Sequence, residues 1–163
     1  MIEIFLRERG LELSSEKTKI VHINEGFDFL GFNVRKYGSK MLIKPARKNV
    51  LLFLKNIREL IKKNGAASTE ELIRQLNARI RGWANYYRHA VSKNTFDRVD
   101  HHTFESVYRW AVRRHPNKNK GWIKNKYFRR QCMRDWIFST KVRDKSGETK
   151  MLDLFRALTH INT

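Results

Sequence analysis

The sequence predicts an α+β fold that is mainly α, a helical bundle with one β-hairpin on its N-terminal side and another on its C-terminal side. Three long segments between residues 47 and 115 carry apolar residues at helical spacing. Two short alternating segments are each interrupted by a turn that contains glycine. With 40% hydrophobic and 12% aromatic residues in 163 positions, the chain has enough apolar side chains to bury a core.

The N-terminal quarter predicts one short helix followed by strands. Residues 2–9 form an amphipathic stretch that ends at a glycine, which is a common helix stop. Residues 18–23 alternate between polar and apolar side chains, and this pattern predicts a strand. Residues 27–34 and 40–44 flank a turn that contains Gly38, so they predict the first hairpin.

The middle of the chain predicts three helices. The first covers residues 47–64 and stops at a glycine. The second opens with a capping box, in which Ser68 is the cap and the Glu71 side chain reaches back to it. The third begins at residue 94 or 95 and ends before Pro116, because a residue that precedes proline disfavours the α conformation. The residues expected to face the core are Val50, Leu51, Leu54, Ile57, Leu60, Ile61, Leu72, Leu76, Ile80, Trp83, Tyr87, Phe96, Val99, Val107 and either Trp110 or Ala111.

Residues 117–130 are rich in basic and aromatic side chains. Pro116 and Gly121 predict a shaped, non-helical loop for the first part of this segment. The net charge of the chain is +19, and eight Lys or Arg, one His and no acidic residue lie from Arg113 to Arg130. A run of cations without acids repels itself, so it is most useful where phosphate groups neutralise it. The charge therefore favours a polyanionic partner.

The C-terminal segment predicts a short helix over residues 122–128 and then the second hairpin. The arms of this hairpin are residues 135–142 and 149–154, which flank a turn that contains glycine. Cys132 is expected to be a small core residue. Residues 156–163 show no clear closing element.

Composition excludes several protein classes. No apolar run approaches the ~20 residues that a membrane helix requires, so no membrane partner is expected. The first five residues lack the basic-then-apolar pattern of a signal peptide. Cys132 is the single cysteine, which excludes an internal disulfide and a cysteine-based metal cage. We expect an intracellular protein.

Catalytic candidates are few. Metal-dependent chemistry on phosphates uses clustered carboxylates, and the best cluster is Asp97 and Asp100 with His101 and Glu105 at helical spacing. The alternative interpretation is favoured, because acids in the first turns of a helix stabilise its dipole. His101 and its neighbour His102 are expected on different helix faces, and no Ser or Cys nucleophile has a recognisable setting. We therefore predict no catalytic residue and no metal site.

Binding candidates are more numerous. Arginines surround Trp83, Tyr86 and Tyr87; we expect Trp83 and Tyr87 to face the core and Tyr86 to be free to contact a sugar or base. The alternative is that all three rings are core and the arginines only solvate the surface. The predicted RNA-binding residues are Arg79, Arg81, Tyr86, Arg88, Lys93, Arg113, Arg114, His115, Lys118, Lys120, Lys124, Lys126, Tyr127, Arg129 and Arg130.

Several motifs carry a family resemblance. Ile80-Arg81-Gly82-Trp83-Ala84-Asn85-Tyr86-Tyr87-Arg88 resembles the hallmark of domain X, the maturase-specific domain of group II intron-encoded proteins. Two downstream segments match the second block of that domain in order and rough spacing, and three upstream segments resemble the last conserved block of a reverse transcriptase domain. These segments are residues 110–116 and 122–128 downstream, and residues 10–14, 16–18 and 27–32 upstream.

The resemblance implies a helical thumb bundle and an RNA-binding function. Proteins of this family bind the intron RNA that encodes them, help it to fold for splicing, and reverse-transcribe it during retrohoming as parts of a mobile element. Domain X also serves as the polymerase thumb, so template–primer duplex and target DNA are further expected partners. The implied division is 1–44 for the end of the palm region, 45–130 for the thumb or domain X, and 131–163 for the start of the DNA-binding region.

The sequence departs from the family pattern in one large respect. Fingers and palm, with the Tyr-x-Asp-Asp motif, do not occur in it, and no His-Asn-His endonuclease block follows. We therefore expect a piece of a longer polypeptide or a truncated open reading frame, whose missing fingers and palm are its partners. Mg²⁺ is expected in the missing palm, and the parent polypeptide is expected to be an RNA-directed DNA polymerase. The resemblance places the protein in the bacterial cytoplasm or, in a eukaryote, in an organelle.

Two other functions stay open on the sequence. One is a small metal-dependent nuclease built on Asp97, Asp100 and a nearby histidine. The other is a stand-alone DNA-binding protein. The order of the motifs favours the maturase interpretation over both.

Overall fold

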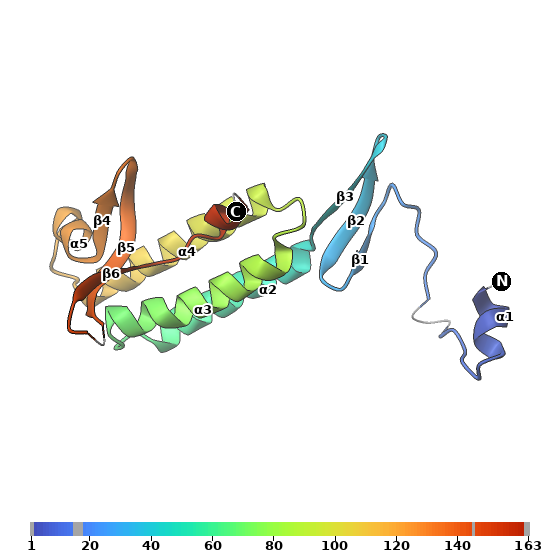
Figure 1. The fold of residues 1–163 in the computed structure, drawn as a ribbon, viewed down its shortest axis with the longest axis horizontal. Coiled ribbons are helices and arrows are strands. Elements are labelled where there is room, and N and C mark those ends of the chain that lie inside the picture. Colours follow the sequence, from blue (N-terminus) through green and yellow to red (C-terminus); the bar gives the residue numbers. More distant parts are fainter. Residues whose placement is uncertain (1, 15–17, 145, 162–163) are drawn as a thin grey trace.

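A computed structural model describes residues 2–14, 18–144 and 146–161 of the chain. The described residues form five α-helices, two three-stranded antiparallel sheets and one short 3₁₀ helix (Figure 1). This arrangement confirms the predicted α+β class. The elements are α1 Ile2–Arg7, β1 Phe27–Phe29, β2 Phe32–Tyr37, β3 Lys40–Pro45, α2 Arg47–Lys63, α3 Thr69–Tyr87, α4 Lys93–Arg114, α5 Lys120–Tyr127, β4 Phe128–Gln131, β5 Arg134–Arg143, β6 Thr149–Asp153 and η1 Ala157–Ile161.

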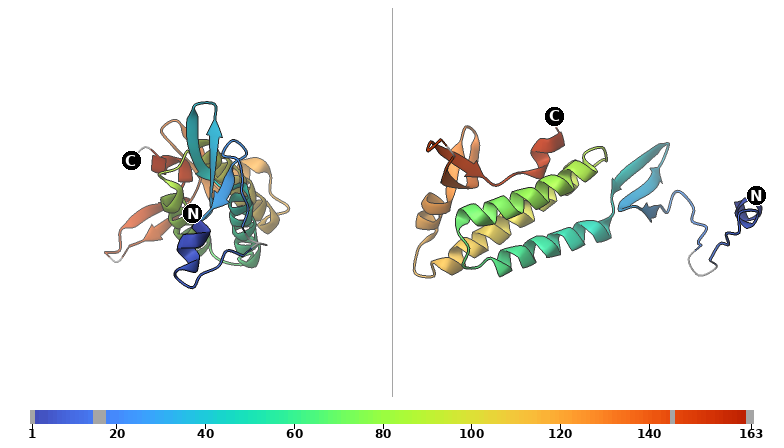
Figure 2. Two further views of the ribbon diagram at one scale, coloured as in Figure 1. Left: turned by 90° about the vertical axis from the view of Figure 1, so that its right-hand side faces the viewer. Right: turned by 60° about the horizontal axis from the view of Figure 1, so that its bottom comes forward.

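The three long helices form the centre of the molecule. The β1–β3 sheet lies at one end of α2, α3 and α4, and the β4–β6 sheet lies with α5 at the other end (Figures 1 and 2). After β6 the chain returns along the bundle, and η1 contacts both α3 and α4. The two sheets therefore present separate surfaces at opposite ends of one helical platform.

The apolar spacing of the helices is the reason for the core. Each long helix buries one stripe of apolar residues, as its 3.6-residue period requires. The prediction for α2 was wrong at Leu51, which is 45% exposed although its neighbours Val50 and Leu54 are buried. Trp83 is half-buried and stacks on Phe53 at 4.7 Å, which joins α3 to α2. The inward side of all three helices is thus formed largely by the residues that the spacing indicated.

The helix boundaries follow from local capping. Ser68 Oγ accepts a hydrogen bond from the Glu71 N–H at 3.1 Å, so the predicted cap of α3 is confirmed. The Glu71 carboxylate accepts a hydrogen bond from Gln75 Nε2 instead of reaching back to the cap. The α4 helix begins at Lys93 and ends at Arg114, within two residues of its predicted start and before Pro116.

The first sheet differs from the expected simple hairpin. Gly38 lies at the predicted turn, and Tyr37 pairs with Lys40 across it. The predicted first arm is broken by a tight turn at Leu30 and Gly31, both with positive φ, so that it forms two strands. Gly31 is also required sterically, because a Cβ there would lie 2.9 Å from the hydroxyl of Tyr87.

The strand predicted over residues 18–23 was wrong. The described structure has no strand over these residues, although the carbonyl of Ile23 accepts a hydrogen bond from the N–H of Lys36 in β2 at 3.0 Å. Ile20 is fully exposed. An alternating pattern alone cannot form a strand, because a strand is stabilised by hydrogen bonds and side-chain contacts with a neighbour.

The C-terminal sheet contains a strand that the sequence did not indicate. β4 directly follows α5 and pairs with β5, so β5 has neighbours on both edges and is the central strand. Cys132 lies at the β4–β5 turn with φ +51° and is exposed, so its assignment to the core was wrong. Gly121 lies inside α5, which begins at Lys120, and the predicted non-helical loop is therefore shorter than expected.

The C-terminal segment is fixed to the helices by side chains that cap its backbone. Asn77 Nδ2 donates to the carbonyl of Asp153 at 2.8 Å, and Asn77 Oδ1 accepts from the N–H of Phe155 at 2.7 Å. The Asp100 carboxylate accepts from the N–H groups of Ala157 and Leu158 at 2.8 and 3.0 Å. The segment thus has a closing element, η1, although the sequence showed no clear one.

Replacing Asn77 by alanine is expected to lower the free energy of unfolding by about 1–3 kcal/mol, because the side chain bonds two backbone groups in a partly buried setting. Urea denaturation measures this change. The matched control is Asn56→Ala on the exposed side of α2, which should change the free energy by no more than about 0.5 kcal/mol. Equal effects of the two substitutions would contradict the role of Asn77.

Candidate nucleic-acid interface

The α5 helix and the residues just before it place four lysines beside two tryptophans. Asn119 caps the helix by accepting a hydrogen bond from the N–H of Trp122 at 2.9 Å. We call the set Lys118, Lys120, Lys124, Lys126, Trp122 and Trp136 the α5 basic surface.

Each lysine of the α5 basic surface lies over an indole ring. The ammonium groups of Lys118 and Lys126 are 5.5 and 4.8 Å from the ring centre of Trp122. Those of Lys120 and Lys124 are 5.9 and 4.9 Å from the ring centre of Trp136. These are cation–π distances. None of the four lysines forms an ion pair with another described residue, so their charge is not neutralised by a carboxylate.

His115 lies at the edge of this surface. Its ring centre is 4.7 Å from that of Trp122, and Nε2 is 2.7 Å from the hydroxyl of Tyr127. Burial lowers the pKa of His115 from its usual value, and the charges of Lys126, Arg114 and Lys118 lower it further. The lowered pKa of His115 thus reflects both its burial and the positive charges around it.

Several other predicted residues have partners within the protein. Arg114 lies over the Trp110 ring at 4.6 Å and donates to the carbonyls of Ala67 and Gly65. Arg129 Nε donates to Asp153 at 2.8 Å, and Arg130 pairs with Asp135 at 3.5 Å. Tyr127 is 4% exposed and belongs to the core. Arg113 is exposed on the last turn of α4.

The remaining predicted residues lie on α3 and at the start of α4. Tyr86, Arg88 and Lys93 are near the end of the bundle that carries β1–β3, and α5 is at the opposite end (Figure 1). Tyr86 is 53% exposed, but its ring stacks on Phe32 and its hydroxyl donates to the carbonyl of Leu30 at 2.6 Å. The fifteen predicted residues therefore do not form one continuous surface.

Two of these arginines lie along α3. Arg81 is placed over the ring of Phe155 at 5.1 Å, and Arg79 is exposed. Arg88 Nε donates to Nε2 of its neighbour His89 at 2.9 Å. Arg79 and Arg81 thus face the C-terminal segment or solvent between the two ends of the bundle.

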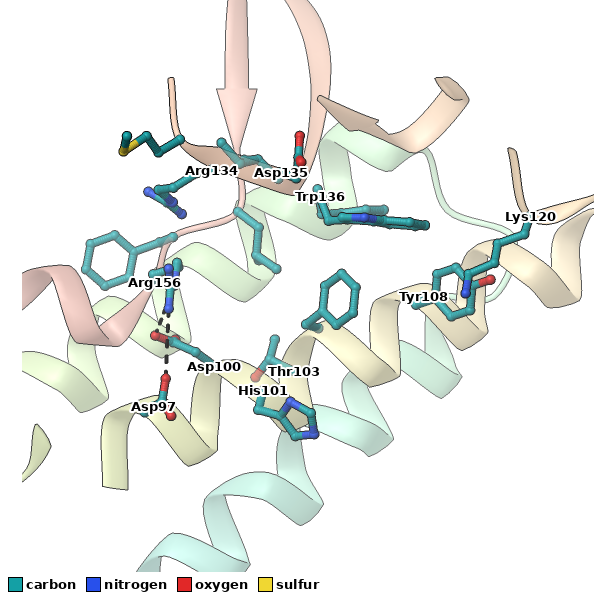
Figure 3. Close-up of a pocket in the computed structure, with 16 residues that line it drawn as sticks. Asp97, Asp100, His101, Thr103, Tyr108, Lys120, Arg134, Asp135, Trp136 and Arg156 are labelled. Carbon is teal, nitrogen blue, oxygen red and sulfur yellow. Dashed lines mark ion pairs between the residues drawn. The ribbon is translucent and has the colours of Figure 1, made fainter. Parts of the chain in front are cut away.

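A cleft of about 790 Å³ lies between α4 and the C-terminal sheet, and sequence reasoning missed it (Figure 3). Phe104 and Tyr108 of α4 line one side, and Trp136 and Arg134 of β5 line the other. No sequence signal indicated that Trp136 lines this cleft. Its position depends on an irregular pairing of β5 with β4, which the sequence of β5 alone does not reveal.

The carboxylates that were the candidate metal ligands form hydrogen bonds and ion pairs within the chain. Asp100 accepts two backbone N–H groups and lies 3.5 Å from Arg156 Nε, and Asp97 also faces Arg156 (Figure 3). Burial raises the pKa of Asp100, while those backbone bonds and Arg156 lower it in part. Glu105 is within 3.6 Å of both His101 and His102, so the two histidines share a partner although different faces were expected.

A comparison with protein families supplies the decisive observation: the group II intron, maturase-specific domain matches residues 50–128. Residues 50–128 belong to this family. The maturase-specific domain thus runs from the first turn of α2 to the start of β4, and it contains the motifs at 80–88, 110–116 and 122–128. A search of curated proteins found no match.

The family match supports a role as a group II intron maturase in splicing, and the nuclease alternative is not favoured. Within the described residues, no three His, Cys, Asp or Glu side chains are grouped so that they could hold a metal ion. In the same part of the chain, no helix is long and apolar enough to cross a membrane. The maturase-specific domain also supplies all four lysines of the α5 basic surface.

Binding of RNA at the α5 basic surface is expected to raise the pKa of His115. Burial holds this pKa below its usual value and the neighbouring positive charges lower it further; phosphates would offset those charges. Binding then takes up protons, so affinity should increase as pH falls from the pKa of the bound state to the lower pKa of the free state. NMR titration of the His115 ring with and without RNA measures the shift. His22, far along the chain, is the control, and an unchanged His115 pKa would contradict the placement.

Proposed function

We propose that this chain is the RNA-binding module of a group II intron maturase, and that it contacts intron RNA through the α5 basic surface. The observation that carries the proposal is that four lysines with no carboxylate partner in the described residues lie over two indole rings. Intron RNA supplies the phosphates that would complete this arrangement, and its release of counterions would provide most of the affinity.

On RNA binding, the lysines would first contact phosphates, and the tryptophans would then stack with bases. A phosphate attracts an ammonium group more strongly than an indole face does, because the phosphate is a full charge. When Lys118 and Lys126 move to phosphates, a face of Trp122 becomes available for stacking with an unpaired base. Phosphate contacts would position the RNA, and the recognition would depend on its shape more than on a base sequence.

The helical platform suits the proposed thumb role. α2, α3 and α4 share one aromatic and aliphatic core, so the surfaces at the two ends are held at a fixed separation. We propose residues 45–130 as thumb and domain X, with residues 1–44 continuing a palm and 131–163 opening a DNA-binding region. In the parent reverse transcriptase, template–primer duplex, target DNA and the Mg²⁺ of the palm would complete the retrohoming machinery.

A competition experiment separates this function from that of a stand-alone DNA-binding protein. The intact chain is titrated with labelled, structured intron RNA in a filter-binding assay, against unlabelled intron RNA or duplex DNA of equal length at the same salt concentration. We expect intron RNA to compete at least tenfold better than DNA. Equal competition would favour the DNA-binding alternative and contradict the proposal.

A further inference from the structure

The cleft between α4 and β5 is lined with aromatic rings that pack edge-to-face against one another. Its volume of about 790 Å³ is within the range of about 300–1,000 Å³ that is typical of small-ligand pockets. The Trp136 ring centre is 6.3 Å from that of Phe104 and 6.0 Å from that of Tyr108, in edge-to-face orientations. All three rings are only half-buried, so they are accessible from the cleft.

A β-bulge places Trp136 in this position. Arg129 pairs with Ile137 and Gln131 pairs with Arg134, so β5 has one more residue than β4 between these pairs. Trp136 lies in the extra stretch with φ +61°. Bulges of this kind often carry glycine, because a bulky residue in the left-handed region is strained. The strained backbone directs an indole ring at α4 (Figure 3), which is the effect that bulges produce near binding sites.

The rim of the cleft carries positive charge. Lys120 lines the cleft and lies over the Trp136 ring, and Arg134 lines it with no ion pair to any described residue. The acids nearby are occupied: Asp135 pairs with Arg130, and Asp97 and Asp100 face Arg156. An aromatic interior with a cationic rim fits a planar aromatic ligand joined to phosphates.

We propose that this cleft binds an unstacked base of single-stranded RNA, with the base beside Trp136 and the flanking phosphates near Lys120 and Arg134. The proposal rests on the RNA-binding function above and names the part of the RNA that is recognised. Aromatic side chains accept any base, because every base has a π-face. The cleft would therefore select unpaired regions of the intron over helical ones.

The test uses the intact chain and three probes: a single-stranded ten-nucleotide oligo(A) RNA, the same length of RNA with abasic sugars, and AMP. We expect the oligo(A) RNA to bind about 5- to 150-fold more tightly than the abasic RNA. Trp136→Gly should abolish this difference, and Trp136→Tyr should retain most of it. Trp136→Gly removes the ring at a position where glycine relieves the backbone strain, and circular dichroism checks that it folds.

Each outcome separates the inference from the proposed function. If both RNAs bind equally and Trp136→Gly has no effect, the cleft is not a base site, although the RNA-binding function stands. If neither RNA binds while structured intron RNA does, the inference is overturned and the RNA-binding function stands. AMP that binds as tightly as the oligo(A) RNA would indicate a free-mononucleotide site and overturn the assignment to RNA. A preference for bases that persists in a folded Trp136→Gly protein would place the base elsewhere.

Discussion

Replacing Trp110 by alanine is expected to lower the free energy of unfolding by about 3–5 kcal/mol. Trp110 is 1% exposed, and it packs against Tyr127 and Phe138 with ring centres 5.7 and 6.0 Å apart. Its Nε1 donates to the carbonyl of Asn64 at 2.9 Å, at the C-cap of α2. A single side chain thus joins α2, α4, α5 and β5, so its loss creates a cavity where the maturase-specific domain meets the C-terminal sheet.

Guanidinium denaturation and thermal melting measure the effect of Trp110→Ala. A loss of about 3–5 kcal/mol corresponds to a melting temperature lower by roughly 10 °C in a chain of this size. Val112→Ala, at a 38% exposed position two residues away, is the matched control and should cost much less. Trp110→Phe keeps most of the packing and loses the hydrogen bond, so its effect should lie between them. Similar stabilities for the alanine variants would contradict the central position of Trp110.

The second large effect concerns RNA affinity. The triple substitution Lys118→Gln, Lys124→Gln and Lys126→Gln is expected to weaken binding of intron RNA by about 100-fold at ~0.1 M salt. Each lost phosphate contact should also reduce the slope of log affinity against log salt by about 0.7–0.9. These lysines have no ion-pair partner in the described part of the chain, so their replacement should leave the fold intact.

A charge-matched variant provides the control for this prediction. Arg47→Gln, Lys48→Gln and Arg58→Gln remove the same charge from exposed positions on α2. If affinity depended on net charge alone, the two triple variants would weaken binding equally, and that result would contradict the role of the α5 basic surface. Arg114 is unsuitable for such a test, because it donates to the carbonyls of Ala67 and Gly65 and its removal would disturb the fold.

The helical part of the fold could be predicted from sequence because its determinants are local. The spacing of apolar residues indicated α2, α3 and α4, and the hydrogen bond from Glu71 N–H to Ser68 fixes the start of α3 as its capping motif indicated. Sheet features were predicted less well. β4 could be recognised only from its pairing with β5. Residues 18–23 have a strand pattern but form no strand in the described structure, although the carbonyl of Ile23 accepts a hydrogen bond from Lys36 of β2.

The sequence predicted where the candidate site lies along the chain, but it did not predict which side chains form it. The run of cations from Arg113 indicated the basic segment, and four of its lysines lie free of carboxylates around α5. Charge along the sequence could not show that Arg129 is paired with Asp153, which is distant in the chain. It also could not show that Trp136 faces α4, because that orientation results from a bulge and a positive φ.

Lysine footprinting tests the central claim most directly. The chain is acetylated in the presence and absence of saturating intron RNA, and modification at each lysine is measured by mass spectrometry. We expect Lys118, Lys120, Lys124 and Lys126 to be protected by RNA, and exposed lysines of α2 such as Lys48 and Lys62 to react equally in both samples. Protection confined to α2, with the lysines of α5 modified at the same rate with and without RNA, would contradict the account.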